Sequence, residues 1–273
     1  MIGRRLGPLL RDAKHGVSGT TRDPAKAARL RAIGVTPVVF NVFDADAVAR
    51  SIASVRPDVV IHQLTDLPNA PGTPGYAAGQ EVNRRLRIEG TRNLVRAALM
   101  AGVGRVIAQS IAFVYASGDG MRNEGDPLDI AAAPPRQFTI QGIVSLEREV
   151  LQTPGIAGVV LRYGYLYGAG TWYDSPPKPP SLHVDAAAHA ALLAIDKGSG
   201  VYNIAEDDGA VSSARAMREL DSIRRSGCRR ILLRTRKAPA EPPPACCGRH
   251  TATGPAERMR LRSRALASFG SPR

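Results

Sequence analysis

Short apolar runs alternate with longer amphipathic stretches along most of the chain. Residues 58–64 and 104–110 are apolar almost throughout, which is typical of strands that are buried on both faces of a sheet. The stretches between such runs carry an apolar residue every three or four positions, as amphipathic helices do. This alternation predicts an α/β fold in which helices cover both faces of a parallel sheet.

Cap and turn residues mark the ends of several predicted elements. Pro24 lies in the first turn of a helix predicted over residues 23–34, and Gly34 ends that helix. Asp44 can cap the next helix, and residues 80–101 are predicted to form one long helix. The predicted strands cover residues 17–21, 37–43, 58–64, 104–110, 158–163 and 200–205.

The charge is distributed unevenly along the chain. The net charge is +13, from 37 Lys and Arg against 24 Asp and Glu. Residues 222–273 hold 13 basic and 2 acidic residues, a net charge of +11, so the other 24 basic and 22 acidic residues give the rest of the chain +2. We therefore predict a folded body over residues 1–221 and a disordered basic tail over residues 222–273.

The tail raises the question of a nucleic-acid partner, because arginine-rich segments bind phosphates. Its only aromatic residue is Phe269, so the aromatic side chains on which bases stack are missing. Nucleic-acid binding is therefore the less favoured interpretation of this segment. The tail also holds all three cysteines, and their spacing fits neither a zinc site nor a disulfide framework.

No apolar run approaches the length of about 18 residues that a membrane-spanning helix needs. The N-terminus also lacks the apolar stretch of a secretory signal. These two features predict a cytoplasmic protein without a membrane partner.

Four stretches of the body follow one another with a spacing that carries information about the family. They are EGTRNLVRAALMAGVGRVIAQSIAFVYA (89–116), VVLRYGYLYGAGTWY (159–173), SLHVDAAAHAALLAI (181–195) and VYNIAEDDG (201–209). Together they resemble the extended short-chain dehydrogenase/reductase family, the group of NAD(P)-dependent epimerases and dehydratases. The resemblance implies a Rossmann sheet with the central strand order 3-2-1-4-5 and a small C-terminal substrate lobe at about residues 164–200.

The same resemblance implies a function. It predicts NADP or NAD as cofactor and hydride transfer on a nucleotide sugar or a similar carbonyl or hydroxyl substrate, as in oxidoreductases and isomerases of this kind. A homodimer would be in keeping with the family. The residues do not separate an epimerase from a dehydratase or a reductase, because all three share the hydride step.

The N-terminal helix matches only the end of the family's G-x-x-G-x-x-G loop. Gly3 takes the place of the last glycine, which opens the first helix and lets the backbone approach the pyrophosphate. The first strand and the other two glycines would lie before Met1. Because that strand is central in the family's sheet, the resemblance predicts two unpaired inner edges, on strands 17–21 and 58–64.

Four further residues are predicted to contact the cofactor. Arg22 follows the strand at 17–21, where a basic residue favours the 2′-phosphate of NADP, although one arginine leaves NADP and NAD about equally favoured. Asn41 takes the place of an acidic residue near the adenine. His62 and Leu64 lie near the end of strand 58–64, and His62 is equally explained as a buried histidine of the core.

The family's catalytic Tyr-x-x-x-Lys pair is replaced. Its two positions fall on Thr139 and Ile143, which cannot carry out the acid–base step. Ser110 and Tyr115 are the nearest hydroxyl groups to the position of the family's catalytic serine. We therefore expect hydride turnover by this chain to be absent or weak, and a non-catalytic dinucleotide-binding module is the alternative.

A cluster of aromatic residues falls on the side of the sheet where the substrate is expected. Tyr165 and Trp172 could clamp a sugar-like or aromatic ligand, and His183 matches a motif near the substrate lobe. Packing between the sheet and the lobe explains the same residues without a ligand. No cluster with the spacing of metal ligands is recognised.

Overall fold

The computed structural model describes residues 1–66, 73–220 and 263–269 of the 273-residue chain. Its main element is a sheet of seven parallel strands in the order β2-β1-β9-β3-β4-β5-β8. The strands are β1 (Gly16–Thr21), β2 (Thr36–Val39), β3 (Val59–Gln63), β4 (Arg105–Ile111), β5 (Ala157–Tyr163), β8 (Gly200–Ile204) and β9 (Arg264–Phe269). The predicted α/β fold with a parallel sheet is therefore confirmed.

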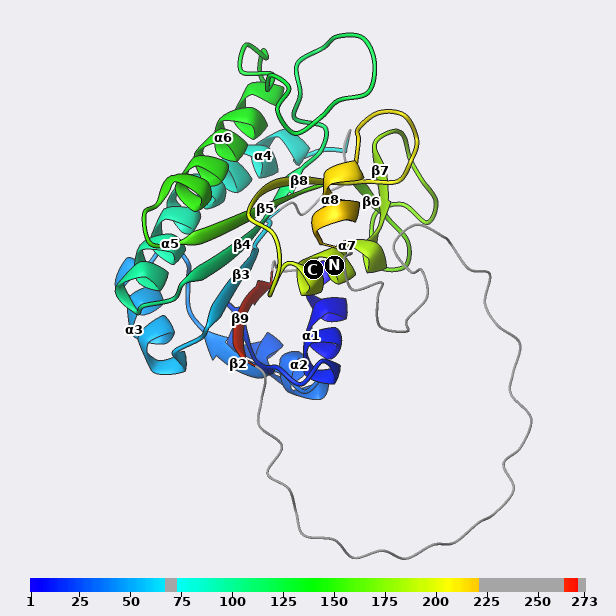
Figure 1. Ribbon diagram of the computed structural model, residues 1–273. Helices are drawn as coiled ribbons and strands as arrows, with labels where there is room; N and C mark the ends of the chain where they lie inside the picture. The colour runs from blue at the N-terminus through cyan, green and yellow to red at the C-terminus, as the bar shows by residue number, and fades with distance from the viewer. Residues whose placement is uncertain (67–72, 221–262, 270–273) are drawn as a thin grey trace, which may run out of the picture.

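Helices cover both faces of this sheet (Figure 1). They are α1 (Ile2–Asp12), α2 (Ala27–Ala32), α3 (Ala45–Val55), α4 (Tyr76–Arg85), α5 (Thr91–Met100), α6 (Arg136–Gln152), α7 (Val184–Leu193) and α8 (Ala214–Glu219). Side chains of α1, α7 and α8 pack on one face, and side chains of α3, α5 and α6 pack on the other. The amphipathic pattern thus buries one stripe of each helix, as predicted.

Three predicted elements differ from those observed. The helix predicted over residues 23–34 is a 3-10 turn, Pro24–Lys26, followed by the shorter α2. Strand β2 ends at Val39, because residues 40–44 turn towards α3, where the Asp44 side chain accepts a hydrogen bond from the Ala47 N–H. The long helix predicted over residues 80–101 begins earlier, at Tyr76, and contains one π-helical turn, η2 (Leu86–Gly90). Turns of this kind are often found at functional sites.

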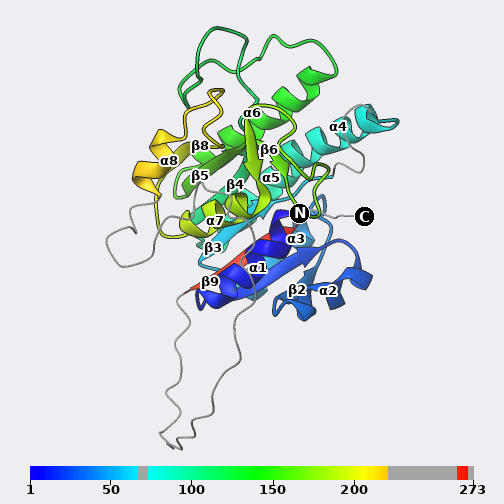
Figure 2. The same cartoon turned by 90° about the vertical axis from the view of Figure 1, so that its right-hand side faces the viewer.

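Strand β9 lies at the centre of the sheet although it comes from the far end of the described chain (Figure 2). It pairs in parallel with β1 on one side and with β3 on the other. Ala265 and Ala267 pack on the side of α1, and Leu266 packs on the opposite side with α3 and α5. The strand therefore takes the position that the first strand has in the Rossmann order.

This placement corrects two expectations. The inner edges of β1 and β3 are paired along their length, because β9 lies between them. The basic tail is not one disordered segment over residues 222–273, since Arg264–Phe269 form a strand. Residues 222–262 and 270–273 of the predicted tail lie outside the described residues.

A second, small sheet lies beyond the end of β5. It consists of β6 (Tyr165–Tyr167) and β7 (Ser181–His183), which pair in parallel. Both fall inside the predicted substrate lobe. Within the described part of the chain, no helix is both long and apolar enough to cross a membrane.

Candidate functional site

A large cavity opens at the carboxyl ends of β3, β4 and β5. Its volume is about 320 Å³. It is bordered by α1, α4, α6 and the segment after β5, through Met1, Ile2, Gly3, Gln63, Thr65, Tyr76, Gln80, Asn83, Arg87, Gln109, Ser110, Ile111, Phe113, Thr139, Tyr163–Leu166 and Gly170–Tyr173. Ligands of open α/β sheets bind at this edge.

The start of α1 forms one border of this cavity. Met1 stands at the N-cap, and its side chain makes no hydrogen bond to the N–H groups of the first turn, which no other described side chain caps. Gly3, the predicted glycine of the loop, is buried and borders the cavity. A helix N-terminus with free N–H groups suits a phosphate group, so these residues fit the dinucleotide that the sequence predicts.

Aromatic side chains form another border. The rings of Phe113 and Tyr165 are stacked, with centroids 3.9 Å apart and an angle of 5° between their planes. The Lys178 ammonium lies 4.9 Å from the centroid of the Tyr165 ring. Tyr165 and Trp172, both predicted substrate residues, border the cavity together. This border suits a flat apolar group.

A smaller hollow lies beside the ends of β1 and β2 and contains three of the predicted cofactor residues, Arg22, Asn41 and Leu64. The Arg22 guanidinium donates hydrogen bonds of 2.8 and 3.3 Å to the two carboxylate oxygens of Asp66. The Asn41 Oδ1 atom accepts a hydrogen bond of 3.1 Å from the Phe43 N–H. Arg22 is half exposed, so this ion pair is weak enough to exchange for another anion.

His62 borders neither of these two spaces. It is fully buried, its Nδ1 accepts a hydrogen bond from the Leu64 N–H, and its Nε2 lies 2.9 Å from the Thr91 hydroxyl. Because Nδ1 is an acceptor, the proton of the neutral ring lies on Nε2 and points to Thr91. Burial, and secondarily the charge of Arg87, lower the pKa of His62 to about 4. These contacts agree with the interpretation as a core histidine.

Replacing His62 with Gln should make the stability of the protein less sensitive to acid. The folded pKa of about 4 lies below the ordinary value of 6.5, so the stability of the native state is complete above pH 6.5 and falls as the pH drops towards 4. The loss from this one group is about 3 kcal/mol. Urea unfolding at several pH values should show a smaller loss in the variant than in the native protein. His189→Gln, at a partly exposed position of α7, should leave the loss unchanged; an equal loss in the His62 variant would contradict the assignment.

Ser110 and Tyr115, the two predicted catalytic hydroxyls, belong to one buried network. The Ser110 hydroxyl donates a hydrogen bond of 2.7 Å to Glu147, which is paired with Arg162 through bonds of 2.6 and 2.9 Å. The Tyr115 hydroxyl accepts a hydrogen bond of 2.9 Å from Arg162 and donates one of 2.6 Å to Asn203. Burial raises the pKa of Tyr115. Ser110 borders the cavity, whereas Tyr115 does not.

The two positions of the family's Tyr-x-x-x-Lys pair lie on α6. The Thr139 hydroxyl donates a hydrogen bond to the Gln80 side-chain oxygen at the cavity border. Ile143 is fully buried in an apolar cluster. Neither side chain can exchange a proton near neutral pH, so the observed site has no acid–base pair at these positions.

His183 lies away from the large cavity. It stands at the N-cap of α7, where its Nδ1 accepts a hydrogen bond of 3.3 Å from the Asp185 N–H. The centroids of the His183 and Tyr167 rings lie 5.2 Å apart, and the rings contact each other edge to face. Asp185 lies in the first turn of α7 and forms an ion pair with Arg5 of α1. This pair joins α1 to α7 across the surface.

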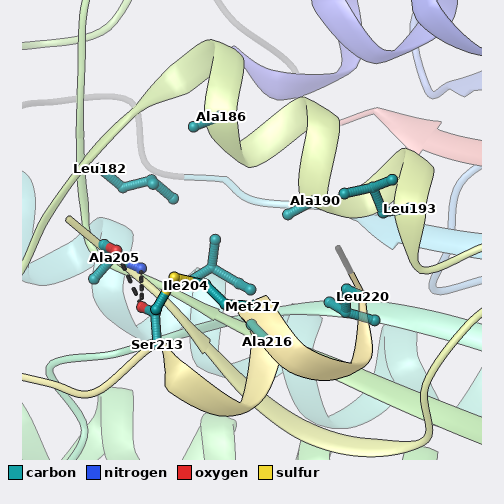
Figure 3. A pocket seen from close by; sticks show the side chains of 10 residues that line it. All are labelled: Leu182, Ala186, Ala190, Leu193, Ile204, Ala205, Ser213, Ala216, Met217 and Leu220. Carbon is teal, nitrogen blue, oxygen red and sulfur yellow. Dashed lines mark hydrogen bonds between the residues drawn. The ribbon is translucent and has the colours of Figure 1, made fainter. Parts of the chain in front are cut away.

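A second apolar hollow lies between α7, β8 and α8 (Figure 3). Its volume is about 30 Å³, the size of a packing gap rather than of a ligand site. Ser213, the one hydroxyl among the ten lining residues, exchanges hydrogen bonds of 3.0 Å with the backbone of Ala205. We assign this hollow to packing.

Two polar residues at the border of the large cavity are not among the site residues predicted from the sequence. Asn83 and Arg87 are both buried, and they lie one helical turn apart on α4 and η2. Together with the buried Thr91 they form an i, i+4, i+8 series. That series marks a polar stripe on the inner face of the helix, and it is the signal that could have revealed them.

Comparisons with known proteins agree with this geometry. Residues 1–164 match the model of a family described as NAD(P)H-binding. A 3-diazoavenalumate denitrifying reductase from a Streptomyces species is 37% identical over 232 residues, which cover 77% of this chain and 74% of that protein.

Solved structures share the fold at lower identity. The UDP-glucose 4-epimerase of Thermotoga maritima, in a complex with UDP-glucose, has a TM-score of 0.63 and 17% identity over 81% of this chain and 89% of that one. The Thermus thermophilus UDP-glucose 4-epimerase in complex with NAD has the same score and identity, over 80% of this chain and 78% of that one. The chain therefore belongs to the NAD(P)H-binding family.

Proposed function

We propose that this protein is an NAD(P)H-dependent reductase that replaces the diazonium group of a small, flat aromatic substrate with hydrogen. In this reaction the carbon–nitrogen bond breaks, dinitrogen leaves with the bonding electron pair, and a hydride from NAD(P)H forms the new carbon–hydrogen bond, which leaves NAD(P)⁺. The 37% identity to a denitrifying reductase over most of both chains supports this reaction class.

The residues at positions 139 and 143 carry the proposal. Oxidation of an alcohol or reduction of a carbonyl moves a proton at oxygen together with the hydride, and the family uses a tyrosine and a lysine for that proton. Replacement of a diazonium group by hydride moves no proton. Thr139 and Ile143 would disable the first kind of reaction, whereas the second does not need the side chains that they replace.

The cavity supports a flat substrate. Its volume of about 320 Å³ falls at the lower end of the range for small-molecule sites. The stacked rings of Phe113 and Tyr165 form an aromatic border of the cavity, and Trp172 adds a second large apolar side chain. The task of these side chains would be to exclude water and to hold the reacting carbon in place.

We assign the cofactor to the two spaces at the carboxyl edge of the sheet. Gly3 and the start of α1 would hold the phosphates. Asn41 and Leu64 would contact the adenosine part, and Arg22 would exchange Asp66 for the 2′-phosphate if the cofactor is NADP. Ser110 would act as a positioning residue, because its hydroxyl is already committed to Glu147.

The proposal is tested with the full chain, 3-diazoavenalumate and NAD(P)H that carries deuterium at the transferred position. We expect deuterium on the product carbon, release of dinitrogen, and a rate at least about a hundredfold above the enzyme-free rate, the contribution expected from positioning. An enzyme-free reaction and heat-inactivated protein are the controls. Epimerisation of UDP-glucose without turnover of the diazo compound would overturn the proposal in favour of the nucleotide-sugar chemistry.

A further inference from the structure

Arg87 is a buried cation that has no directly bonded counter-ion among the described residues. Only 6% of this residue is exposed, and it borders the large cavity. Among the residues that the structure describes, none forms a hydrogen bond or an ion pair with its guanidinium. Its neighbour in sequence, Glu89, is instead bound by the exposed Arg85. A buried charge of this kind is costly unless a ligand or a partner supplies the opposite charge.

Asn83 adds an unpaired donor one helical turn away. Its side chain is fully buried, and its Oδ1 accepts a hydrogen bond of 3.2 Å from the Asp66 N–H. Its Nδ2 group has no hydrogen-bond partner within the described ranges, although it is buried. Residues four apart on a helix share one face, so this N–H₂ group and the Arg87 guanidinium border the same cavity.

The surroundings make room for Arg87. A Cβ atom at Gly142 of α6 would lie 3.2 Å from the Arg87 Cδ atom and 3.3 Å from its Cβ atom, so any larger residue there would press on the arginine stem. The π-helical turn η2 contains Arg87 itself. The next residue along α6 is the apolar Ile143. At the cavity, η2 therefore supplies a positively charged side chain, whereas the described α6 residue that borders it, Thr139, is uncharged.

The charge of Arg87 persists at neutral pH. Burial lowers its pKa to about 10, which still leaves the guanidinium protonated under ordinary conditions. The Tyr76 phenol, only when ionised, and the Glu147 carboxylate act in the opposite direction and are weaker than the effect of burial. The cavity therefore has a permanent positive group and an unused amide donor at one border.

We propose that Arg87 and Asn83 form the binding site for a carboxylate group of the substrate. A guanidinium can donate two parallel hydrogen bonds to the two oxygens of a carboxylate, and the Asn83 amide can donate a third. The inference that the substrate carries a diazonium group rests on the function proposed above. The inference that it carries a carboxylate rests only on the residues of the cavity. A phosphate of the cofactor, the remaining source of an anion, would be held by Gly3 and the start of α1, at another border of the same cavity.

The test compares two ligands that differ only in charge. The full chain, saturated with NADP⁺, is titrated with 4-hydroxycinnamate and with the corresponding primary amide, followed by Trp172 fluorescence and calorimetry. We expect the native protein to bind the acid about a hundredfold more tightly than the amide, as for the loss of one partner of a buried charged hydrogen bond. In Arg87→Gln the two ligands should bind equally weakly, and Arg87→Lys should restore part of the preference.

Arg85→Gln is the matched control, because this arginine lies two residues away and is 56% exposed at its side chain. It should keep the full preference for the acid. Arg87→Met should raise the melting temperature of the ligand-free protein, since it removes an unpaired buried charge, whereas a purely structural arginine would lower it. An unchanged preference for the acid in Arg87→Gln would overturn the proposal.

Two further outcomes separate the possible causes of failure. A loss of NADP⁺ affinity in Arg87→Gln, with the preference for the acid intact, would assign the site to the cofactor phosphate and overturn the substrate carboxylate. Preference for the acid without any turnover of 3-diazoavenalumate would support the carboxylate site, while it would count against the reaction proposed above. The anion site and the reaction are thus tested independently.

Discussion

Replacing Leu266 with Asp should unfold most of the protein at room temperature. Leu266 is fully buried at the centre of the sheet and packs with the side chains beneath α3 and α5. Loss of a buried leucine costs about 2–5 kcal/mol, and the carboxylate adds the penalty of an unpaired buried charge. The sum is comparable with the total stability of an ordinary domain, about 5–15 kcal/mol. Circular dichroism and urea unfolding would measure the loss.

Arg264→Gln is the matched control within the same strand, because the Arg264 side chain is exposed and its backbone N–H keeps its bond to Asp58. It should change the stability by less than about 0.5 kcal/mol. If the Leu266→Asp protein unfolds at the same urea concentration as the native protein, β9 is not part of the folded sheet.

Deletion of residues 263–273 removes β9 and tests its contribution to the sheet in a second way. We expect the shortened protein to expose the edges of β1 and β3 and to aggregate, because each edge carries a row of unpaired backbone groups. A synthetic peptide that contains Arg264–Phe269 should restore part of the solubility, whereas a peptide with Asp in place of Leu266 should not.

Glu147→Gln should destabilise the protein by about 3–5 kcal/mol. The carboxylate is buried and holds the guanidinium of Arg162 through two hydrogen bonds, and both side chains are less than a tenth exposed. Gln keeps the size of the side chain but leaves Arg162 as an unpaired buried charge. Arg162→Met should cost a similar amount, since it leaves the buried Glu147 carboxylate with the Ser110 hydrogen bond but without its bonded cation.

The double variant separates the pair from its surroundings. If the two charges depend on each other, the double variant should lose at least about 2 kcal/mol less than the sum of the single changes. Urea unfolding of the four proteins gives this coupling energy. Additive losses would show that the pair contributes nothing as a pair. Arg92→Gln, on the neighbouring α5, removes a more exposed ion pair with Glu149 of α6; it should change the stability little and serves as the control.

Most of the sheet could be predicted from the sequence. The strands at residues 58–64 and 104–110 each have a continuous apolar centre, Val59–Ile61 and Val106–Ala108, and such runs are typical of a buried strand. Strand β9 was missed for the opposite reason. Its sequence RALASF alternates small residues with a single leucine, and it stands among arginines and prolines that favour disorder. This sequence can be recognised as a strand only from the sheet order, in which the position between β1 and β3 would otherwise be empty.

The site was predicted in part. Gly3, Tyr165 and Trp172 border the cavity, because the family pattern places them at the carboxyl edge of the sheet. Asn83 and Arg87 were missed, since a charged residue in a helix is normally exposed and sequence patterns count it as polar surface. The π-helical turn that carries Arg87 has no sequence signature of its own.

The position of β9 also bears on the order in which the protein can fold. The side chains of His15 and Ser263 meet at 2.7 Å although 248 positions separate them along the chain. Contacts of such long range form late, because closing a long loop costs entropy before any contact repays it. The pair β1-β2 and the group β3-β4-β5-β8 can each form from nearer segments, but only β9 joins them. Completion of the sheet, and with it of the cofactor edge, is therefore expected to be the slow step of folding.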